Sequence, residues 1–328
     1  MTTRILVTGG AGFIGSHYVR TLLGPDGPGD VALTVLDKLT YAGNPANLDA
    51  VRAHPGFRFV QGDICDPATV RALMAEHDQV VHFAAESHVD RSIDGGDTFV
   101  YTNVLGTHTL VAAAHQAGID TFVQISTDEV YGSIDEGSWP ETHPLRPSSP
   151  YSSAKASGDL VALSYHHTHG LDVRVTRCSN NYGHHHFPEK AIPLFITHLM
   201  DGRQIPLYGD GGNVRDWLHI DDHVQGIELV RTRGRAGEVY NIGGGTELSN
   251  RELTELLLAE FGADWDTSVL PVADRKGHDR RYSVDCTKIR EELGYAPRVP
   301  FAQGLADTVR WYRENRAWWE PLKARAAL

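Results

Sequence analysis

A short apolar run stands directly before a glycine-rich turn near the start of the chain: Arg4–Thr8 reads RILVT and Thr8–Ser16 reads TGGAGFIGS. Gly9, Gly12 and Gly15 match the pattern GxxGxxG. Glycine permits a tight turn and lets the backbone approach a pyrophosphate at the N-terminus of the helix that follows. The same motif on its own also fits a flexible turn before an ordinary helix. The sequence around it must therefore decide.

Strand-like and helix-like patterns alternate through the first half of the chain. Short apolar runs, typical of strands buried on both faces, are Arg4–Thr8, Val31–Asp37, Phe57–Gln61, Gln79–Ala84, Thr121–Thr127 and Asp172–Arg177. Helical patterns between them are Gly12–Leu23, Ala46–His54, Pro67–His77, Thr98–Ala117 and Tyr151–His169. This alternation predicts an α/β fold with a doubly wound parallel sheet, the Rossmann arrangement.

The rhythm changes after about residue 185, where prolines separate shorter elements. Later helical patterns are Asp221–Thr232, Asn250–Phe261, Thr287–Leu293 and Phe301–Arg316, and Val239–Ile242 is a candidate strand that returns to the first sheet. We expect residues 1–185 to form a dinucleotide-binding domain with a return segment near 220–250. Residues 186–328 should form mainly a smaller, interleaved α/β domain for the substrate.

Composition excludes several classes of protein. The 328 residues include 42 acidic and 30 basic side chains, and the net charge of −12 argues against non-specific binding of nucleic acid or anionic membranes. No apolar run approaches the roughly 18 to 20 residues of a membrane span, and the first ten residues lack signal-peptide architecture. The three cysteines form no disulfide framework or paired zinc motif. A reducing, cytoplasmic location is the expectation.

An acidic residue near the glycine turn indicates which dinucleotide is bound. Asp37 ends the second predicted strand, about 20 residues beyond Gly15, where a carboxylate hydrogen-bonds the adenosine ribose hydroxyls. Because a carboxylate repels a 2′-phosphate, it favours NAD over NADP. Lys38 is the opposing sign, since a base there would tolerate the phosphate. Small or polar residues that follow the third and fourth strands near the same cofactor are Asp63, Ile64, Ala84 and Ala85.

Tyr151 and Lys155 form a YxxxK motif at the start of a predicted helix. The i, i+4 spacing places both side chains on one face. Tyrosine, with a pKa of about 10, is a poor base near neutrality, but a lysine cation and the positive nicotinamide ring favour the phenolate. An exposed aromatic beside a solvated lysine would also fit YxxxK alone. Its place after a nucleotide-binding half, with Thr127 ending the fifth strand, favours the catalytic interpretation.

Two adjacent carboxyls, Asp128 and Glu129, follow that fifth strand in the stretch STDEVYG. They fall at the carboxyl edge of the sheet, where open α/β folds bind ligands. Two nearby carboxyls in a closed site tend to split their pKa values, so that one stays protonated. One acid and one base are the groups needed to eliminate water.

These motifs together resemble the nucleotide-sugar 4,6-dehydratases of the extended short-chain dehydrogenase/reductase superfamily. Further matching stretches are Leu36–Asn44, Ala84–Ser92, Arg177–Gly183, Phe187–Lys190, Tyr208–His219 and Gly277–Tyr282, so the resemblance covers nearly the whole chain. It implies a tightly held NAD that is recycled within each turnover and a homodimer built through two helices of the first domain. The implied substrate is a nucleotide sugar, with dTDP-glucose expected.

The resemblance also implies a role for each catalytic residue. Tyr151 takes the proton of the sugar's 4-hydroxyl while hydride leaves carbon 4 for NAD; Lys155 holds the nicotinamide ribose and Thr127 the 4-oxygen. Glu129 then removes the proton on carbon 5, and Asp128 protonates the departing 6-hydroxyl. Return of hydride to carbon 6 gives the 4-keto-6-deoxy sugar, so the enzyme is formally a lyase.

Binding residues follow from the same resemblance. On the cofactor it places Gly9, Gly12, Phe13, Ile14, Gly15, Asp37, Lys38, Leu39, Thr40, Asp63, Ile64, Ala84, Ala85, Thr102, Tyr151, Lys155 and Asn181. On the nucleotide sugar it places Ser87, Thr127, Asn180, Lys190, Pro206, Tyr208, Arg215, Asn250, Arg275, His278 and Tyr282. The two arginines suit a diphosphate, because guanidinium binds phosphate oxygens bidentately.

One departure from the family's pattern invites a metal hypothesis. His184–His186 replaces a proline-aromatic sequence, and we expect it near the nucleotide side of the pocket. Consecutive residues rarely converge on one ion, and no carboxylate support is evident nearby. The prediction is therefore that there is no metal site.

Three alternatives remain open. A nucleotide-sugar 4-epimerase or 4-reductase would need Tyr151 and Lys155 but no acid–base pair. A 4,6-dehydratase acting on another NDP-hexose would need all of these residues. A non-catalytic NAD-sensing protein would need none of the reactive side chains.

Overall fold

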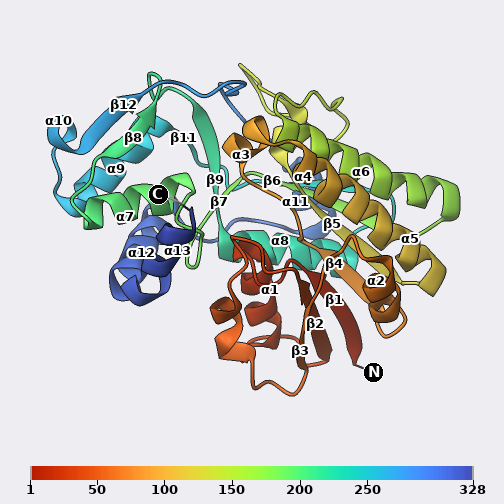
Figure 1. The fold of residues 1–328 in the computed structure, drawn as a ribbon. Helices are drawn as coiled ribbons and strands as arrows, with labels where there is room; N and C mark the ends of the chain where they lie inside the picture. Colours follow the sequence, from red (N-terminus) through yellow and green to blue (C-terminus); the bar gives the residue numbers. More distant parts are fainter. Residues whose placement is uncertain (1, 327–328) are drawn as a thin grey trace.

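The computed structural model describes residues 2–326 and contains, within that range, a parallel sheet of seven strands (Figure 1). Its spatial order is β10-β6-β5-β4-β1-β2-β3. The strands are β1 (Thr3–Thr8), β2 (Val31–Asp37), β3 (Phe57–Gln61), β4 (Gln79–His82), β5 (Thr121–Thr127), β6 (Val173–Cys178) and β10 (Val239–Ile242). The predicted doubly wound sheet, including its returning strand, is confirmed.

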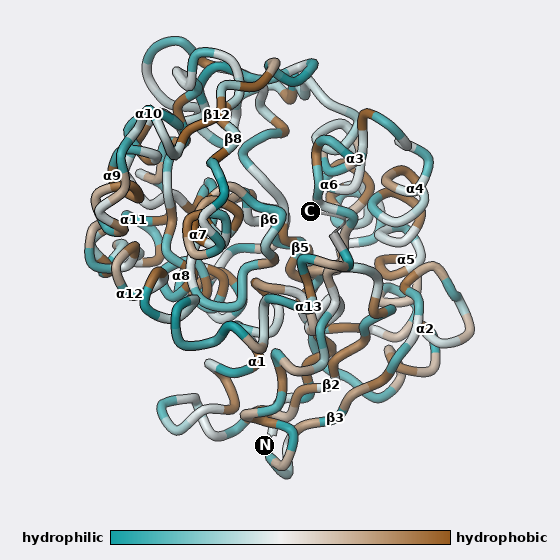
Figure 2. The backbone as a smooth tube through the Cα atoms, turned by 60° about the vertical axis from the view of Figure 1, so that its left-hand side comes forward, coloured by the Kyte–Doolittle hydropathy of each residue, from teal (hydrophilic) through white to brown (hydrophobic). Residues whose placement is uncertain are grey.

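Helices cover both faces of this sheet, as its unbroken apolar strands require. One face carries α1 (Phe13–Leu23), α8 (Ile220–Arg233) and α11 (Thr287–Leu293). The other carries α2 (Pro67–Met74), α5 (Thr107–Ala117) and α6 (Pro150–His169). Alternate residues of β1 separate the two cores, because Ile5 and Val7 enter the first and Leu6 the second. The tube in Figure 2 is most hydrophobic along the strands of the sheet and more hydrophilic over the outer loops.

The remaining elements build a smaller lobe beside the sheet (Figure 1). Its strands are β7 (Asn180–Tyr182), β8 (Ile205–Tyr208), β9 (Val214–His219), β11 (Glu247–Ser249) and β12 (Val269–Val272). Its helices are α7 (Ala191–Met200), α9 (Asn250–Phe261), α10 (Trp265–Ser268), α12 (Phe301–Glu314) and α13 (Arg316–Ala326). They enclose a separate core that includes Trp217, Leu253 and Trp319.

Several helices differ from the sequence prediction. The predicted helix at 46–54 is a shorter 3₁₀ helix, η1 (Pro45–Val51), and the one predicted at 301–316 ends at Glu314. The prediction missed α13, α7 and the short α3 (Val89–Asp94). Within residues 2–326, no helix combines the length and the apolar character that a membrane crossing requires.

The helix predicted at 98–117 is divided into α4 (Asp97–Val100), a π-helical turn η2 (Tyr101–Gly106) and α5. The physical reason lies in one polar side chain. Asn103 Oδ1 accepts a hydrogen bond from Glu86 N at 2.9 Å, and its Nδ2 donates to Glu86 O at 3.0 Å. The helix opens at Asn103, which ties it to the loop after β4.

Candidate active site

A cavity of about 340 Å³ lies at the carboxyl ends of β1, β4 and β5. The strand order reverses between β1 and β4, which is where open α/β sheets bind ligands. Every residue predicted to bind the cofactor lines this cavity except Leu39. Leu39 has a positive φ of 58°, and its amide donates to Asp37 Oδ1 at 2.8 Å. Its observed contact is thus with Asp37, which does line the cavity.

The glycine turn leaves room for a ligand at the N-terminus of α1. A Cβ on Gly9 would lie 2.5 Å from Ala84 N, and one on Gly15 would lie 2.4 Å from Gly9 O. The turn therefore packs too closely against β4 and itself for any larger residue. No side chain caps α1, and its first turn carries no acidic residue. Its first N–H groups are available for an anion such as a pyrophosphate.

The contacts of Asp37 and Lys38 show which of the two opposite charges faces the dinucleotide. Asp37 Oδ2 accepts a hydrogen bond from Ala11 N at 2.9 Å, which holds the carboxyl at the cavity wall. Lys38 Nζ lies 2.6 Å from Asp63 Oδ2, so its charge is paired within the protein. The arrangement fits a dinucleotide whose adenosine ribose carries no phosphate.

Tyr151 and Lys155 occupy the first turns of α6. Ser149, the N-cap of the helix, forms a capping box with Ser152, and Pro150 between them begins the first turn. Burial raises the pKa of Tyr151 well above its usual value and Glu129 adds to the rise, whereas the hydrogen bond with Thr127 acts against it.

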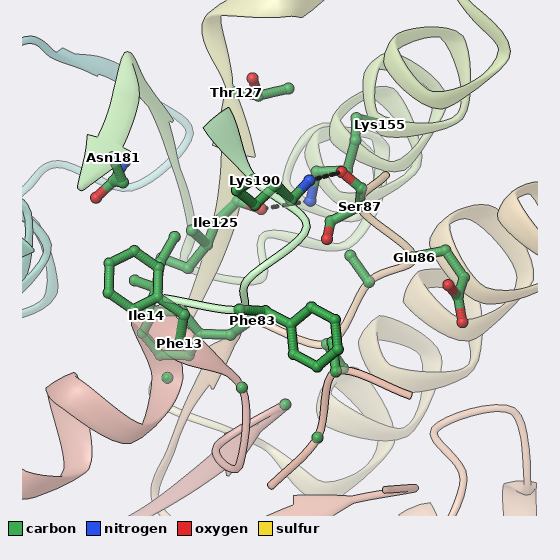
Figure 3. Close-up of a pocket in the computed structure, with 18 of the residues that line it drawn as sticks. Phe13, Ile14, Phe83, Glu86, Ser87, Ile125, Thr127, Lys155, Asn181 and Lys190 are labelled. Atoms are coloured by element: carbon green, nitrogen blue, oxygen red, sulfur yellow. Dashed lines mark hydrogen bonds between the residues drawn. The ribbon is translucent and has the colours of Figure 1, made fainter. Parts of the chain in front are cut away.

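The sequence predicts that Lys155 and the positive nicotinamide ring together lower the pKa of Tyr151; Lys155 by itself does not offset the burial of the phenol. Lys155 Nζ donates to Ile125 O at 2.6 Å (Figure 3), and burial lowers the pKa of this ammonium. Burial of the phenol dominates instead. A phenolate at Tyr151 thus needs the positive charge of a bound cofactor in addition to the lysine.

The two adjacent carboxyls are buried with unequal surroundings. They begin the short 3₁₀ helix η3 (Asp128–Tyr131), and Thr127 Oγ1 accepts a hydrogen bond from Glu129 N at 3.2 Å. Burial raises the pKa of Asp128 well above its ordinary value, and Glu129 and Asp216 add to the rise.

Burial also raises the pKa of Glu129, but the positive charges of Arg275 and Arg215 oppose that rise. The rise is thus opposed by nearby positive charges more at Glu129 than at Asp128. Within residues 2–326, Asp128 Oδ2 has no hydrogen-bond partner. The assignment of one carboxyl as acid and the other as base stays a prediction.

The residues predicted to bind the sugar nucleotide fall into two groups. Ser87, Thr127, Asn180 and Lys190 line the cavity, and Lys190 Nζ donates to Ser87 O at 2.7 Å (Figure 3). The cavity wall does not include Pro206, Tyr208, Arg215, Asn250, Arg275, His278 and Tyr282.

Several members of the second group contact one another. The Arg215 guanidinium lies 4.2 Å from the centre of the Tyr282 ring. The Tyr208 and His278 rings are 6.1 Å apart, and Arg275 Nη1 lies 3.8 Å from Asp90 Oδ1. The positive charges of both arginines act on the pKa of Glu129, which lines the cavity. Asn250, the first residue of α9, donates its amide to Asn213 O at 2.9 Å.

Residues 6–308 match the family model described as GDP-mannose 4,6 dehydratase. The chain belongs to this family. It is 69% identical over 322 residues to a dTDP-glucose 4,6-dehydratase of Streptomyces griseus, which covers 98% of each chain. A dTDP-glucose 4,6-dehydratase of Streptomyces venezuelae, solved with NAD bound, is 63% identical with a TM-score of 0.96, covering 98% of this chain and 100% of that chain.

The chain is also similar to solved structures of proteins named for a different reaction. A UDP-glucose 4-epimerase of Thermotoga maritima, solved with UDP-glucose, has a TM-score of 0.88 at 31% identity and covers 96% of this chain and 100% of that chain. The overall fold of the 4,6-dehydratase family is thus compatible with more than one reaction, and the side chains in the cavity must decide between them.

Several further residues line the cavity that were not predicted from the sequence, including Glu86, Glu189 and Trp217. Asn103, which holds Glu86 by both backbone atoms, was not predicted either. A signal for Asn103 was present, because a polar residue on the buried side of an otherwise apolar helix needs a partner. Trp217 on β9 gave no such signal, since its place beside the cavity depends on the second sheet.

The three consecutive histidines point in different directions. The His186 ring stacks on Phe13 with ring centres 4.2 Å apart and lines the cavity. His184 and His185 contact Trp311 in α12. The rings diverge because His186 packs on Phe13 whereas His184 and His185 pack on Trp311. Across residues 2–326, no cluster of three or more metal-type side chains is placed to hold an ion.

Proposed function

We propose that the chain is an NAD-dependent dTDP-glucose 4,6-dehydratase, a lyase that forms dTDP-4-keto-6-deoxyglucose. The reaction comprises oxidation at carbon 4, elimination of water across carbons 5 and 6, and reduction at carbon 6. The observation that carries this proposal is the buried Asp128–Glu129 pair in the same cavity as Tyr151. The dTDP-glucose 4,6-dehydratases among its relatives, identical at 69% and 63% of positions, support it.

Each proton transfer of the reaction is assigned to one residue of the cavity. Bound NAD supplies a hydride acceptor at carbon 4 and a hydride donor at carbon 6. Tyr151 takes the proton of the 4-hydroxyl, with Thr127 holding the 4-oxygen and Lys155 holding the nicotinamide ribose. The ketone at carbon 4 acidifies the proton on carbon 5. Glu129 removes that proton, and Asp128 protonates the departing 6-hydroxyl.

The proposed binding sites follow the two lobes. The cofactor lies along the carboxyl edge of the sheet, with its pyrophosphate at α1 and its adenosine ribose at Asp37. The nucleotide sugar extends toward Lys190, Arg215 and Arg275, whose positive charges suit a diphosphate. We accordingly assign residues 1–185, with the return segment near 220–250, to the cofactor and residues 186–328 mainly to the nucleotide sugar.

The acid–base pair is also what favours this reaction over its alternatives. A 4-epimerase or 4-reductase moves hydride to and from carbon 4 and has no use for a carboxylic acid beside a carboxylate. A protein that only senses NAD has no use for Tyr151 either. Burying Asp128 and Glu129 side by side costs stability, so a catalytic use is the better account of their retention.

Purified protein incubated with dTDP-glucose is expected to form the 4-keto-6-deoxy product, detected by its characteristic absorbance in base and by mass loss of one water. UDP-glucose, GDP-mannose and CDP-glucose at equal concentration should react more slowly. Formation of dTDP-galactose without loss of water would establish the epimerase instead. Tight NAD binding with no turnover of any of the four sugars would establish the binding protein.

We further propose that the enzyme is a homodimer and works in the cytoplasm. Apolar side chains stand exposed on α4, η2 and α6: Val100 (57% exposed), Tyr101 (50%), Leu105 (43%) and Leu160 (60%). Contiguous exposed apolar residues of this kind are typical of a subunit interface. The cysteines Cys65, Cys178 and Cys286 are thiols, which suits a reducing compartment.

The double substitution Leu105→Glu with Leu160→Glu is expected to convert the dimer into a monomer, measured by size-exclusion chromatography with light scattering. Burying two new carboxylates in the interface would cost far more than leaving them in water. Leu256→Glu is the matched control, because Leu256 is 42% exposed on α9 in the other lobe. A monomeric wild type, or an equal effect of the control, would contradict the proposal.

A further inference from the structure

His223 is a fully buried histidine that the proposed reaction does not use. It lies in the first turn of α8, beside β7, and is 0% exposed. Burial lowers the pKa of this imidazole to about 3, so the ring is neutral and carries a single N–H donor. A buried polar side chain needs a partner, and the partner of His223 belongs to the wall of the cofactor cavity.

The partner is the side-chain amide of Asn181 on β7. His223 Nδ1 lies 2.8 Å from Asn181 Oδ1, and Asn181 Nδ2 donates to Ser179 O at 2.9 Å. A reversed amide would set two oxygens against each other at Ser179, so Oδ1 is the atom that faces His223. The imidazole is therefore the donor, with its proton on Nδ1. Within residues 2–326, its Nε2 has no hydrogen-bond partner, which a lone pair tolerates better than an N–H group.

The second N–H of the same amide points along the cavity wall. Asn181 Nδ2 also donates to Cys178 Sγ at 3.4 Å, and Asn181 and Cys178 both line the cavity. Cys178 pairs with Thr127 across β6 and β5, at the end of the sheet that carries the proposed catalytic residues. Because a thiol is only a weak acceptor, this N–H is available to a stronger acceptor on the cofactor, such as the carboxamide oxygen of nicotinamide.

We propose that His223 is a positioning residue for the cofactor, which holds Asn181 Oδ1 and so directs the Asn181 N–H group toward the nicotinamide end of bound NAD. Within residues 2–326, His223 is not among the side chains that line the cavity. Its effect on the cofactor must therefore pass through Asn181. The inference rests on the proposed function, which places NAD along the carboxyl edge of the sheet, and adds a residue to that site.

The hydrogen bond between His223 and Asn181 has a specific consequence when it is lost. Asn181 Oδ1 would be left without its donor, and an unsatisfied buried acceptor costs more than the net value of the bond. The amide would then be free to turn, and the hold on the nicotinamide end of the cofactor would weaken. A histidine that served only to fill space would instead change stability to the same extent whether or not Asn181 is present.

The test measures how fast the holoenzyme exchanges bound NAD for isotopically labelled NAD, followed by mass spectrometry after desalting. His223→Leu removes the donor and keeps the bulk, so exchange should become faster on the order of 10-fold. His223→Asn offers an N–H close to the place of Nδ1 and should remain within about threefold of wild type. Added to Asn181→Ala, His223→Leu should give no further increase, because both substitutions remove one contact.

A buried histidine in the other lobe provides the matched control. His198 lies on α7, and its Nδ1 is 2.7 Å from Gln204 O. His198→Leu should leave the exchange of NAD unchanged. ADP-ribose, which lacks nicotinamide, locates the effect along the cofactor: in His223→Leu, the ratio of NAD to ADP-ribose bound from an equal mixture should fall on the order of 10-fold.

Additive effects of His223→Leu and Asn181→Ala would overturn the proposal, as would an unchanged ratio of NAD to ADP-ribose. If thermal unfolding shows that His223→Leu does not fold, the smaller His223→Val takes its place in the same comparison. The exchange of NAD requires no sugar. Turnover of dTDP-glucose by the wild type, measured separately, therefore tests the dehydratase function independently of His223.

Discussion

Tyr151→Phe is expected to lower kcat for dTDP-glucose by at least about 10³-fold, within the range for loss of a positioned acid–base group. The variant keeps the ring, which packs edge-on against Phe99 with centres 6.3 Å apart, but has no phenolic oxygen. Burial of the phenol disfavours its ionised form, and the phenylalanine ring has no group there that must ionise. The variant should therefore fold and hold NAD at least as well as wild type while failing to oxidise carbon 4.

The measurement is steady-state product formation, together with NAD content and thermal unfolding. Tyr240→Phe is the matched control, because Tyr240 is a buried tyrosine on β10 whose hydroxyl donates to Glu292 Oε2 at 2.9 Å. Its loss should cost about 1 kcal/mol of stability and leave turnover unchanged. Activity of Tyr151→Phe within tenfold of wild type would show that another group takes the 4-hydroxyl proton.

The double variant Asp128→Asn with Glu129→Gln is expected to separate oxidation from elimination. Tyr151, Lys155 and the cofactor remain, so hydride should still leave carbon 4. Neither amide can donate a proton to the 6-hydroxyl or accept one from carbon 5, so loss of water should fall by at least about 10³-fold, combining two acid–base contributions. Reduced cofactor and a 4-keto sugar that retains its 6-hydroxyl should accumulate.

Absorbance of the reduced nicotinamide and mass spectrometry of the sugar follow the two steps independently. Adding Tyr151→Phe to the double variant is the control, because it should abolish the reduced-cofactor signal as well. Both substitutions relieve the burial of charge and keep the shape of the side chains, so the fold should persist. Full dehydration by the double variant would overturn the roles of Asp128 and Glu129.

Much of the cofactor site was predictable because its geometry is local. A strand, a glycine turn and a helix follow one another in Thr3–Leu23, and the positions of the first N–H groups depend on that stretch alone. Asp37 ends the next strand, which pairs directly with β1. Residues that follow the ends of neighbouring parallel strands meet at one edge, so the predicted cofactor residues, all but Leu39, do line the cavity.

The positions of the residues on the substrate side could not be predicted from neighbouring residues in the sequence. Arg215 lies on β9, whose neighbours β7 and β11 come from distant parts of the chain. Its charge reaches Glu129 only because this second sheet stands beside the first. Likewise, the place of His186 against Phe13 depends on contacts between α12 and the loop after β7. No periodicity in the sequence reports contacts of this kind.

The amino-acid sequence by itself determined the doubly wound sheet, the glycine turn and the presence of a Tyr–Lys pair and an Asp–Glu pair, because each depends on spacing along one element or on the order of neighbouring strands. Only the tertiary structure decided the surroundings that shift their pKa values. Burial beside Glu129 and Asp216 raises the pKa of Asp128, burial outweighs the contact with Thr127 in raising that of Tyr151, and Lys155 is directed to a backbone carbonyl. Burial and charge are sums over residues far apart in the chain, so only the folded protein sets them.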